Sequence, residues 1–189
     1  MNLSFLNNVS RQLCASLAGS LIVIALVGCA SQQQQEKDAQ LLKTRARAHT
    51  DLGAYYYQQG RLDIALDEFK EAAKIDPSFA FAFNGLGLVH AALGEYSVAD
   101  ANFKKAIQID PNNSESRNNY GNFLCGQNRI DESIKEFMAA VKNPLYPTPA
   151  IAYANAGICS LRKNDSVNGE AFLHRALQID PLLNGAAYQ

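Results

Sequence analysis

The chain has 189 residues, of which 48% are hydrophobic and 19% charged, and its formal net charge is −1. This composition is ordinary for a single globular domain and excludes a highly charged disordered chain. A net charge so close to zero gives no electrostatic basis for binding nucleic acid, so we expect no nucleic-acid partner.

Residues 1–28 have the features of a signal peptide rather than of a folded segment. Arg11 precedes an apolar run of about 15 residues from Leu13 to Val27, which is shorter than the roughly 20 residues of a membrane span. The run ends in Leu26-Val27-Gly28-Cys29 and is followed at once by a polar, glutamine-rich stretch. This arrangement resembles the bacterial lipoprotein signal, in which a small residue before the cysteine permits cleavage and the thiol carries a lipid. The alternative is an ordinary N-terminal membrane anchor with an incidental cysteine, and the short core and abrupt polar run disfavour it.

The resemblance to lipoproteins implies a mature chain that begins at Cys29 and carries a covalent diacylglycerol and an N-acyl lipid such as palmitate there. Several acyl chains on one residue give stable membrane attachment, whereas one chain gives only marginal binding. Because Ala30 and Ser31 follow and no aspartate does, the resemblance also implies sorting to the outer membrane, on its periplasmic face. Residues 29–45 then form a lipidated tether, expected to be loose from Gln32 to about Lys43 and helical toward the domain that follows.

The rest of the chain repeats one pattern of two amphipathic helices separated by a breaker. The spacing of equivalent glycines is 34, 34 and 36 residues, which divides the domain 46–183 into four copies and leaves 184–189 as the start of an incomplete further repeat. The four copies are 46–79, 80–113, 114–149 and 150–183. The breaker is glycine or asparagine in every copy, the two residue types that most easily take a left-handed backbone. These four residues are Gly60, Gly94, Asn128 and Asn164.

Small and large side chains recur at fixed positions of the two helices. The first helix carries a glycine in every copy, and the second carries an alanine and a large apolar residue. We expect the small residues to let the paired helices approach closely while the large ones fill the space beside them. The glycines are Gly53, Gly87, Gly121 and Gly157, and the large residues are Phe69, Phe103, Phe137 and Leu173.

This 34-residue pattern, with Asp-Pro ending most copies, resembles the tetratricopeptide repeat. The predicted fold is therefore all-α, a solenoid of about four stacked antiparallel helix pairs. Its last end is expected to be poorly capped, because Leu173, Leu177 and Ile179 have no following repeat to pack against.

No motif for catalysis, phosphate binding or metal binding appears, and the histidines have no ligand-type spacing. We therefore expect a protein that is not an enzyme, with no small-molecule substrate and no cofactor or metal besides the lipid. Cys125 and Cys159 lie in first helices between apolar neighbours. A disulfide between them is an alternative, but the roughly 10 Å between neighbouring helices favours two buried free thiols.

In stacked helix pairs the first helices line a concave groove that binds extended or helical peptides. The resemblance to the repeat family places apolar side chains and amides of this chain on that surface. The predicted partner-binding residues are Tyr57, Phe81, Asn84, Leu88, Asn118, Asn119, Asn122, Ile151, Asn155 and Ile158. Each could instead serve only packing or solvation, but the set favours a protein-binding groove. Only Arg47 and Arg162 are basic there, which disfavours a C-terminal carboxylate as the ligand.

The lipoprotein signal, the glutamine-rich tether and the repeats together are similar to the type IV pilus biogenesis and stability lipoproteins of the PilF/PilW family. The most specific stretch is 143–157, where Leu145-Tyr146-Pro147 interrupts the repeat period. The resemblance implies a pilotin, which helps secretin subunits reach the outer membrane and multimerise there. Members of this family usually carry about six repeats, so the shorter chain is a departure. The alternative is a general envelope scaffold that recruits peptidoglycan hydrolases or outer-membrane assembly factors.

Overall fold

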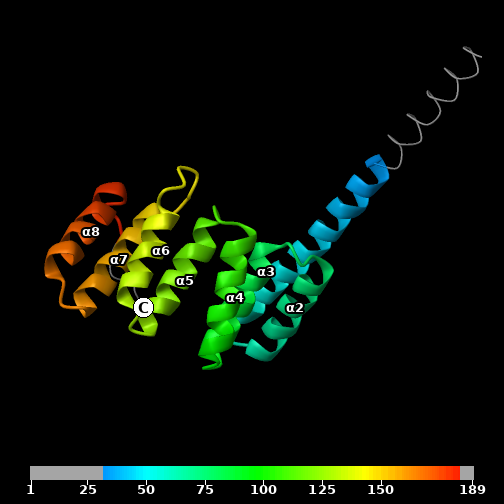
Figure 1. The fold of residues 1–189 in the computed structure, drawn as a ribbon, viewed down its shortest axis with the longest axis horizontal. Coiled ribbons are helices and arrows are strands. Elements are labelled where there is room, and N and C mark those ends of the chain that lie inside the picture. The colour runs from blue at the N-terminus through cyan, green and yellow to red at the C-terminus, as the bar shows by residue number, and fades with distance from the viewer. Residues whose placement is uncertain (1–31, 184–189) are drawn as a thin grey trace, which may run out of the picture. The chain divides into compact units, whose positions relative to one another are not determined.

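The computed structural model describes residues 32–183, and this part of the chain contains helices and no strands (Figure 1). The predictions for the signal peptide, for Cys29 and for residues 184–189 lie outside the described residues. The chain divides into one unit that ends at Thr44 and a second that begins at Arg45.

In the first unit, residues 32–44 are helical and all their side chains are exposed. A loose tether was expected here, and that prediction is wrong for these residues. The segment is rich in Gln, Glu, Lys, Ala and Leu, which are strong helix formers. One local contact adds support, because Gln34 Nε2 donates to Asp38 Oδ1 one turn later, at 2.9 Å.

The second unit is a row of helix pairs, and the predicted all-α solenoid is confirmed. Residues 45–58 are helical and open the first pair. The seven helices that follow are α2 (Leu62–Ile75), α3 (Ala80–Ala92), α4 (Tyr96–Ile109), α5 (Ser114–Gly126), α6 (Ile130–Ala140), α7 (Pro149–Arg162) and α8 (Ser166–Ile179). Within the pairs α3 packs on α4, α5 on α6 and α7 on α8, and each pair also contacts the next.

The predicted left-handed residues turn the chain between the two helices of every pair. Their φ angles are 71° at Gly60, 78° at Gly94, 60° at Asn128 and 63° at Asn164. A positive φ lets the chain reverse within a few residues, and glycine and asparagine tolerate it best. The breaker pattern is therefore confirmed in all four copies.

The close helix approach is also confirmed, and the contact is more direct than expected. The glycine that recurs in each first helix lies directly against the large apolar side chain of its own second helix. A Cβ atom added at Gly87 would lie 2.8 Å from the Phe103 ring, and one at Gly121 would lie 2.6 Å from the Phe137 ring. Phe103 and Phe137 are both fully buried. No larger residue fits without moving the ring.

The third pair is joined to the fourth by a proline-rich loop, residues 141–148. The Asn143 side chain organises this loop, since Nδ2 donates to the Asn112 carbonyl at 3.2 Å and Oδ1 accepts from the Leu145 amide at 3.0 Å. Tyr146 is buried against Ala140 and Ala152. The two extra residues of this copy thus form an ordered connection that holds α6 and α7 together.

The last helix presents apolar side chains to solvent, as predicted for a poorly capped end. Leu177 is 48% exposed and Ile179 is 39% exposed. Leu173 differs, because it is half-buried and contacts Gly157 of α7.

We predict that Gly121→Ala destabilises the domain by about 1–3 kcal/mol, because the new methyl group would overlap Phe137 in a fully packed interior. Gly126→Ala is the matched control in the same helix, since a Cβ atom there meets nothing within 4 Å. The control should unfold at the wild-type urea concentration or slightly above it. Urea denaturation followed by circular dichroism measures both variants. Equal effects of the two substitutions would contradict the glycine–ring contact.

Candidate binding groove

A pocket of about 240 Å³ lies between the helix of residues 45–58 and α3. Four of the predicted partner-binding residues line it, namely Tyr57, Phe81, Asn84 and Leu88. Phe81 is the most exposed large apolar side chain among them, with 39% of its surface accessible. The structure thus brings together the predicted residues of the first two repeats. We call this the groove pocket.

Two small residues in the lining of the groove pocket let the Phe69 ring reach it. Gly85 and Ala54 line it together with the Phe69 ring. A Cβ atom on Gly85 would overlap that ring. The Phe69 side chain of α2, the second helix of the first repeat, therefore forms the floor of the groove pocket. The sequence pattern predicted pocket residues only from first helices.

The predicted asparagines mostly pair with one another. Asn119 Nδ2 donates to Asn84 Oδ1 at 3.3 Å, and Asn155 Nδ2 donates to Asn118 Oδ1 at 3.2 Å. Asn84 and Asn118 are buried. Both amide pairs therefore link neighbouring repeats, a role that the sequence did not indicate. Among the described residues the Asn84 Nδ2 group has no acceptor, so it remains available at the groove pocket.

The other predicted residues lie outside the groove pocket, on α5 and α7. Asn122 is exposed on α5, while Ile151 and Ile158 are half-buried on α7. Their assignment to a partner stays a prediction.

Sequence reasoning missed Glu115, which lines the groove pocket from the first turn of α5. Glu115 occupies the same repeat position as Phe81 and Ile151, the second residue of each repeat copy. The repeat pattern could therefore have identified it.

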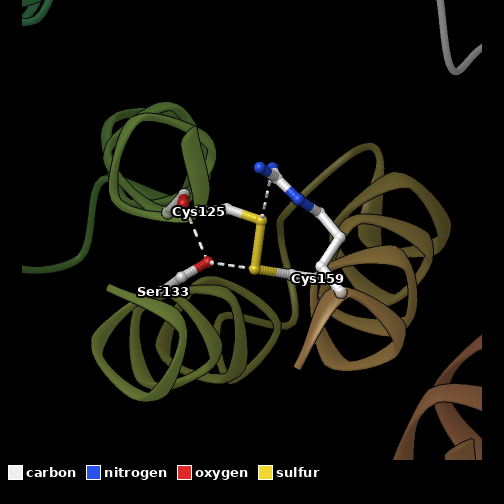
Figure 2. Close-up of a disulfide and its surroundings, with 5 residues drawn as sticks. Cys125, Ser133 and Cys159 are labelled. Atoms are coloured by element: carbon white, nitrogen blue, oxygen red, sulfur yellow. Dashed lines mark hydrogen bonds between the residues drawn. A yellow bond between two sulfur atoms is a disulfide. The ribbon is translucent and has the colours of Figure 1, made fainter. Parts of the chain in front are cut away.

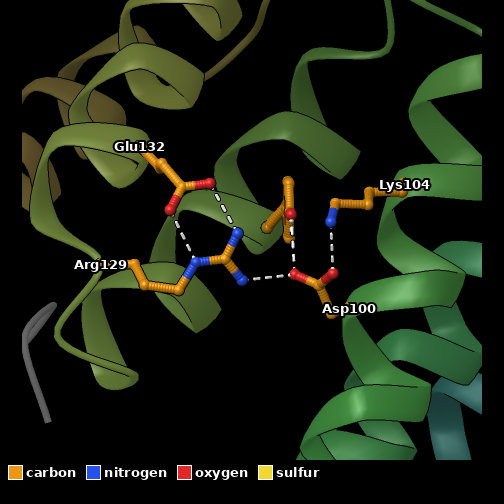
Figure 3. A network of polar contacts seen from close by, with 5 residues as sticks. Asp100, Lys104, Arg129 and Glu132 are labelled. Carbon is orange, nitrogen blue, oxygen red and sulfur yellow. Dashed lines mark hydrogen bonds and ion pairs between the residues drawn. The ribbon is translucent and has the colours of Figure 1, made fainter.

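A polar network fixes the junction between the second and third repeats (Figure 3). The Asp100 carboxylate of α4 lies 2.6 Å from Lys104 Nζ, accepts from Arg129 Nη1 at 2.6 Å and accepts from the Tyr120 hydroxyl at 2.8 Å. Arg129 also donates two hydrogen bonds to the Glu132 carboxylate, at 2.7 and 2.6 Å. Burial alone would raise the pKa of Asp100, but the hydrogen bonds from Lys104, Arg129 and Tyr120 outweigh it and hold the pKa below its ordinary value.

A disulfide joins the third and fourth repeats, and the prediction of two free thiols is wrong. Figure 2 shows the bond between Cys125 of α5 and Cys159 of α7. Neighbouring helix axes lie roughly 10 Å apart, but these two residues stand at different repeat positions and point into the same junction. Their Cα atoms are therefore only 5.9 Å apart. At the junction between the second and third repeats, Ala91 stands at the position of Cys125 and Phe123 at the position of Cys159. Both belong to one apolar cluster there.

Residues 32–183 contain no group of three or more His, Cys, Asp and Glu side chains placed to hold a metal ion. Two histidines pair with single carboxylates instead. His49 Nδ1 lies 2.7 Å from Glu68 Oε2, and His90 Nδ1 lies 2.5 Å from Glu95 Oε2. None of the helices in this part of the chain combines the length and the apolarity that a membrane span requires.

Comparison with known families confirms the repeat type. Models of the tetratricopeptide repeat match residues 53–94, 80–113 and 102–135.

Comparison with whole proteins identifies relatives named for pilus assembly. The chain is 31% identical over 166 residues to the type IV pilus assembly protein PilF of Pseudomonas aeruginosa, a match that covers 85% of this chain and 64% of PilF. The solved structure of that PilF is similar with a TM-score of 0.73 and 28% identity, over 77% of this chain and 65% of the other. The structure of PilW, described as a widely conserved type IV pilus biogenesis factor, is similar with a TM-score of 0.69 and 34% identity, over 73% and 63%. The chain thus spans slightly less than two thirds of each relative.

We predict that Asp100→Asn lowers the free energy of unfolding at pH 7 by about 1–3 kcal/mol, because three donors lose a charged acceptor. The folded-state pKa of Asp100 lies below the unfolded value of about 3.9, so its stabilisation is full above that value and is lost as pH falls through the folded pKa. The difference between wild type and variant should persist from pH 7 to about 5 and shrink below about 4. Urea denaturation at several pH values measures it.

Asp131→Asn is the control for this substitution, because the Asp131 side chain is 80% exposed and pairs only with Lys163. It should change stability little at any pH. If the difference in unfolding free energy between wild type and Asp100→Asn stays constant down to pH 3, the charge of Asp100 does not have the stabilising role given to it.

We predict that reducing the disulfide lowers the free energy of unfolding by about 3–4 kcal/mol, because the bond closes a loop with a sequence separation of 34 and so restricts the unfolded chain. The double variant Cys125→Ala, Cys159→Val is the reference, since alanine and valine occupy these positions in repeat two. Dithiothreitol should lower the urea midpoint of the wild type and leave that of the variant unchanged. An unchanged midpoint for the wild type would show that the bond contributes nothing.

Proposed function

We propose that this chain serves type IV pilus biogenesis as a pilotin. It is built of tetratricopeptide repeats, and its homology to the type IV pilus biogenesis factors PilF and PilW supports the proposal. In this role it is a non-catalytic adaptor that binds the secretin subunit and promotes its localisation and multimerisation at the outer membrane. The observation that carries the proposal is the groove pocket, a hollow lined by first-helix residues of the first two repeats on a scaffold shared with pilus biogenesis factors.

The groove pocket suits an extended segment of a protein partner. Tyr57, Phe69, Phe81 and Leu88 give it aromatic and aliphatic wall area beside its polar residues, which favours the burial of an apolar side chain. The free Asn84 amide at its edge can donate to a backbone carbonyl, which would orient the bound segment. A solenoid built from rigid helix pairs presents such a surface with little ordering cost.

The proposed location is the periplasmic face of the outer membrane, with the lipid on Cys29 as the anchor. Two observations support export. The sequence before Cys29 resembles a lipoprotein signal, and the Cys125–Cys159 disulfide is of the kind that persists in oxidising compartments such as the periplasm.

Complementation of a deletion strain tests the proposal. Deleting the gene should abolish heat-stable secretin multimers and twitching motility, and the wild-type gene should restore both. Phe81→Asp should fail to restore them, because it places a charge in the groove pocket. The substitution should not unfold the protein, because Phe81 is exposed and aspartate is favourable in the first turn of a helix.

Val167→Asp is the matched control, because Val167 is also the second residue of its helix and is 78% exposed, but lies on α8 away from the groove pocket. It should complement fully.

A third variant, Cys29→Ser, should release the protein from the membrane fraction and leave secretin unassembled there. Normal multimers in the deletion strain would overturn the pilotin role, and co-purification of peptidoglycan hydrolases instead of secretin would favour the scaffold alternative.

A further inference from the structure

A second pocket adjoins the groove pocket on the side of the third repeat. It has a volume of about 460 Å³ and is bounded by the proline-rich loop 141–148 and the start of α5. Phe81 and Glu115 line both pockets. The two hollows are therefore neighbours on one surface, separated by these two side chains. We call the second one the loop pocket.

The loop pocket offers a fixed apolar contact. Leu145 lines it and is 86% exposed. Its position is set by the Asn143 bond to the Leu145 amide and by burial of the next residue, Tyr146. A large apolar side chain held in solvent on an ordered loop contributes nothing to the core, and such exposure is typical of a contact surface.

The charges at these pockets are all of one sign. Only Asp110 and Glu115 are charged among the residues that line either pocket, and no lysine or arginine lines them. Asp110 is partly engaged, since its Oδ1 atom accepts from the Asn112 amide at 3.1 Å. The nearest arginine in sequence, Arg117, is already paired with Glu136. Within residues 32–183 Glu115 makes no ion pair, so a carboxylate without a counter-charge stands between two apolar hollows.

From this juxtaposition we propose that the two pockets bind one extended peptide segment of the partner, with two apolar side chains flanking a lysine or arginine. One apolar side chain enters the groove pocket and the other packs on Leu145 in the loop pocket. The basic residue between them meets Glu115. Charge complementarity of this kind selects among partners more than it adds affinity. The inference rests on the proposed function, because it specifies the ligand of the same groove.

Selection from a displayed library of random dodecapeptides tests the proposal, using the purified full-length protein in detergent. The wild type should enrich peptides that carry lysine or arginine between two apolar residues. Glu115→Lys should enrich aspartate or glutamate at that place instead. Leu145→Ser should remove the preference at one of the two apolar places and keep the other.

Fluorescence anisotropy with one enriched, synthesised peptide then measures the contribution of the charge. Glu115→Gln should weaken binding about two- to fivefold at low salt, the range of an exposed ion pair, and the difference should shrink as salt is added. Glu170→Lys is the matched control, because Glu170 is an exposed glutamate on α8 that lines neither pocket. It should leave both the selected pattern and the affinity unchanged.

The outcomes separate this inference from the function on which it rests. Suppose that the wild type enriches apolar peptides without a basic residue between them, and that Phe81→Asp abolishes this enrichment. That result would overturn the inference and leave the groove pocket as the binding site. Failure to enrich any peptide, or enrichment that survives Phe81→Asp, would overturn both.

Discussion

The contact between a glycine of each first helix and a large side chain of its second helix is the constraint on which the rest of the structure depends. It sets how closely the paired helices approach. It therefore also sets how much apolar surface each pair leaves unburied, which must pack against the neighbouring pair. In the first repeat the same contact shapes the surface. Phe69 packs against Gly53 of its own repeat and against Gly85 of the next, which leaves its ring at the floor of the groove pocket. Packing and binding surface thus have one physical origin.

The three junctions between repeats are built differently, although the helices repeat. The first is apolar and contains the groove pocket. The second carries the ion network around Asp100, and the third carries the disulfide and the ordered proline-rich loop. The later junctions are thus reinforced by bonds that the first lacks. A rigid support next to an unfilled hollow is what pre-organised binding of a peptide requires.

The helix pairs, their left-handed connections and the close approach of paired helices at the recurring glycines were predictable, because each depends on residues within one repeat at a constant spacing. The groove site was predictable in part. Tyr57, Phe81, Asn84 and Leu88 do line one pocket, since their repeat positions fix the face of the helix on which they lie. The asparagine pairs and Glu115 were not recognised, because what they do depends on which side chains of another repeat stand opposite. The helical state of residues 32–44 was missed because a polar composition alone does not distinguish an exposed helix from a loose tether.

The sequence by itself determined the architecture, because a period of about 34 residues with helical spacing on both sides of a glycine or asparagine admits one kind of packing. It also contained the lipoprotein-like segment before Cys29, which depends only on contiguous residues. Only the tertiary structure decided what happens between repeats. It brought the Cα atoms of Cys125 and Cys159 to 5.9 Å despite their different repeat positions, and it placed loop 141–148 beside Phe81 and Glu115. The reason is geometric, since contacts across a junction depend on how far two side chains project toward each other, and no spacing along the chain records that distance.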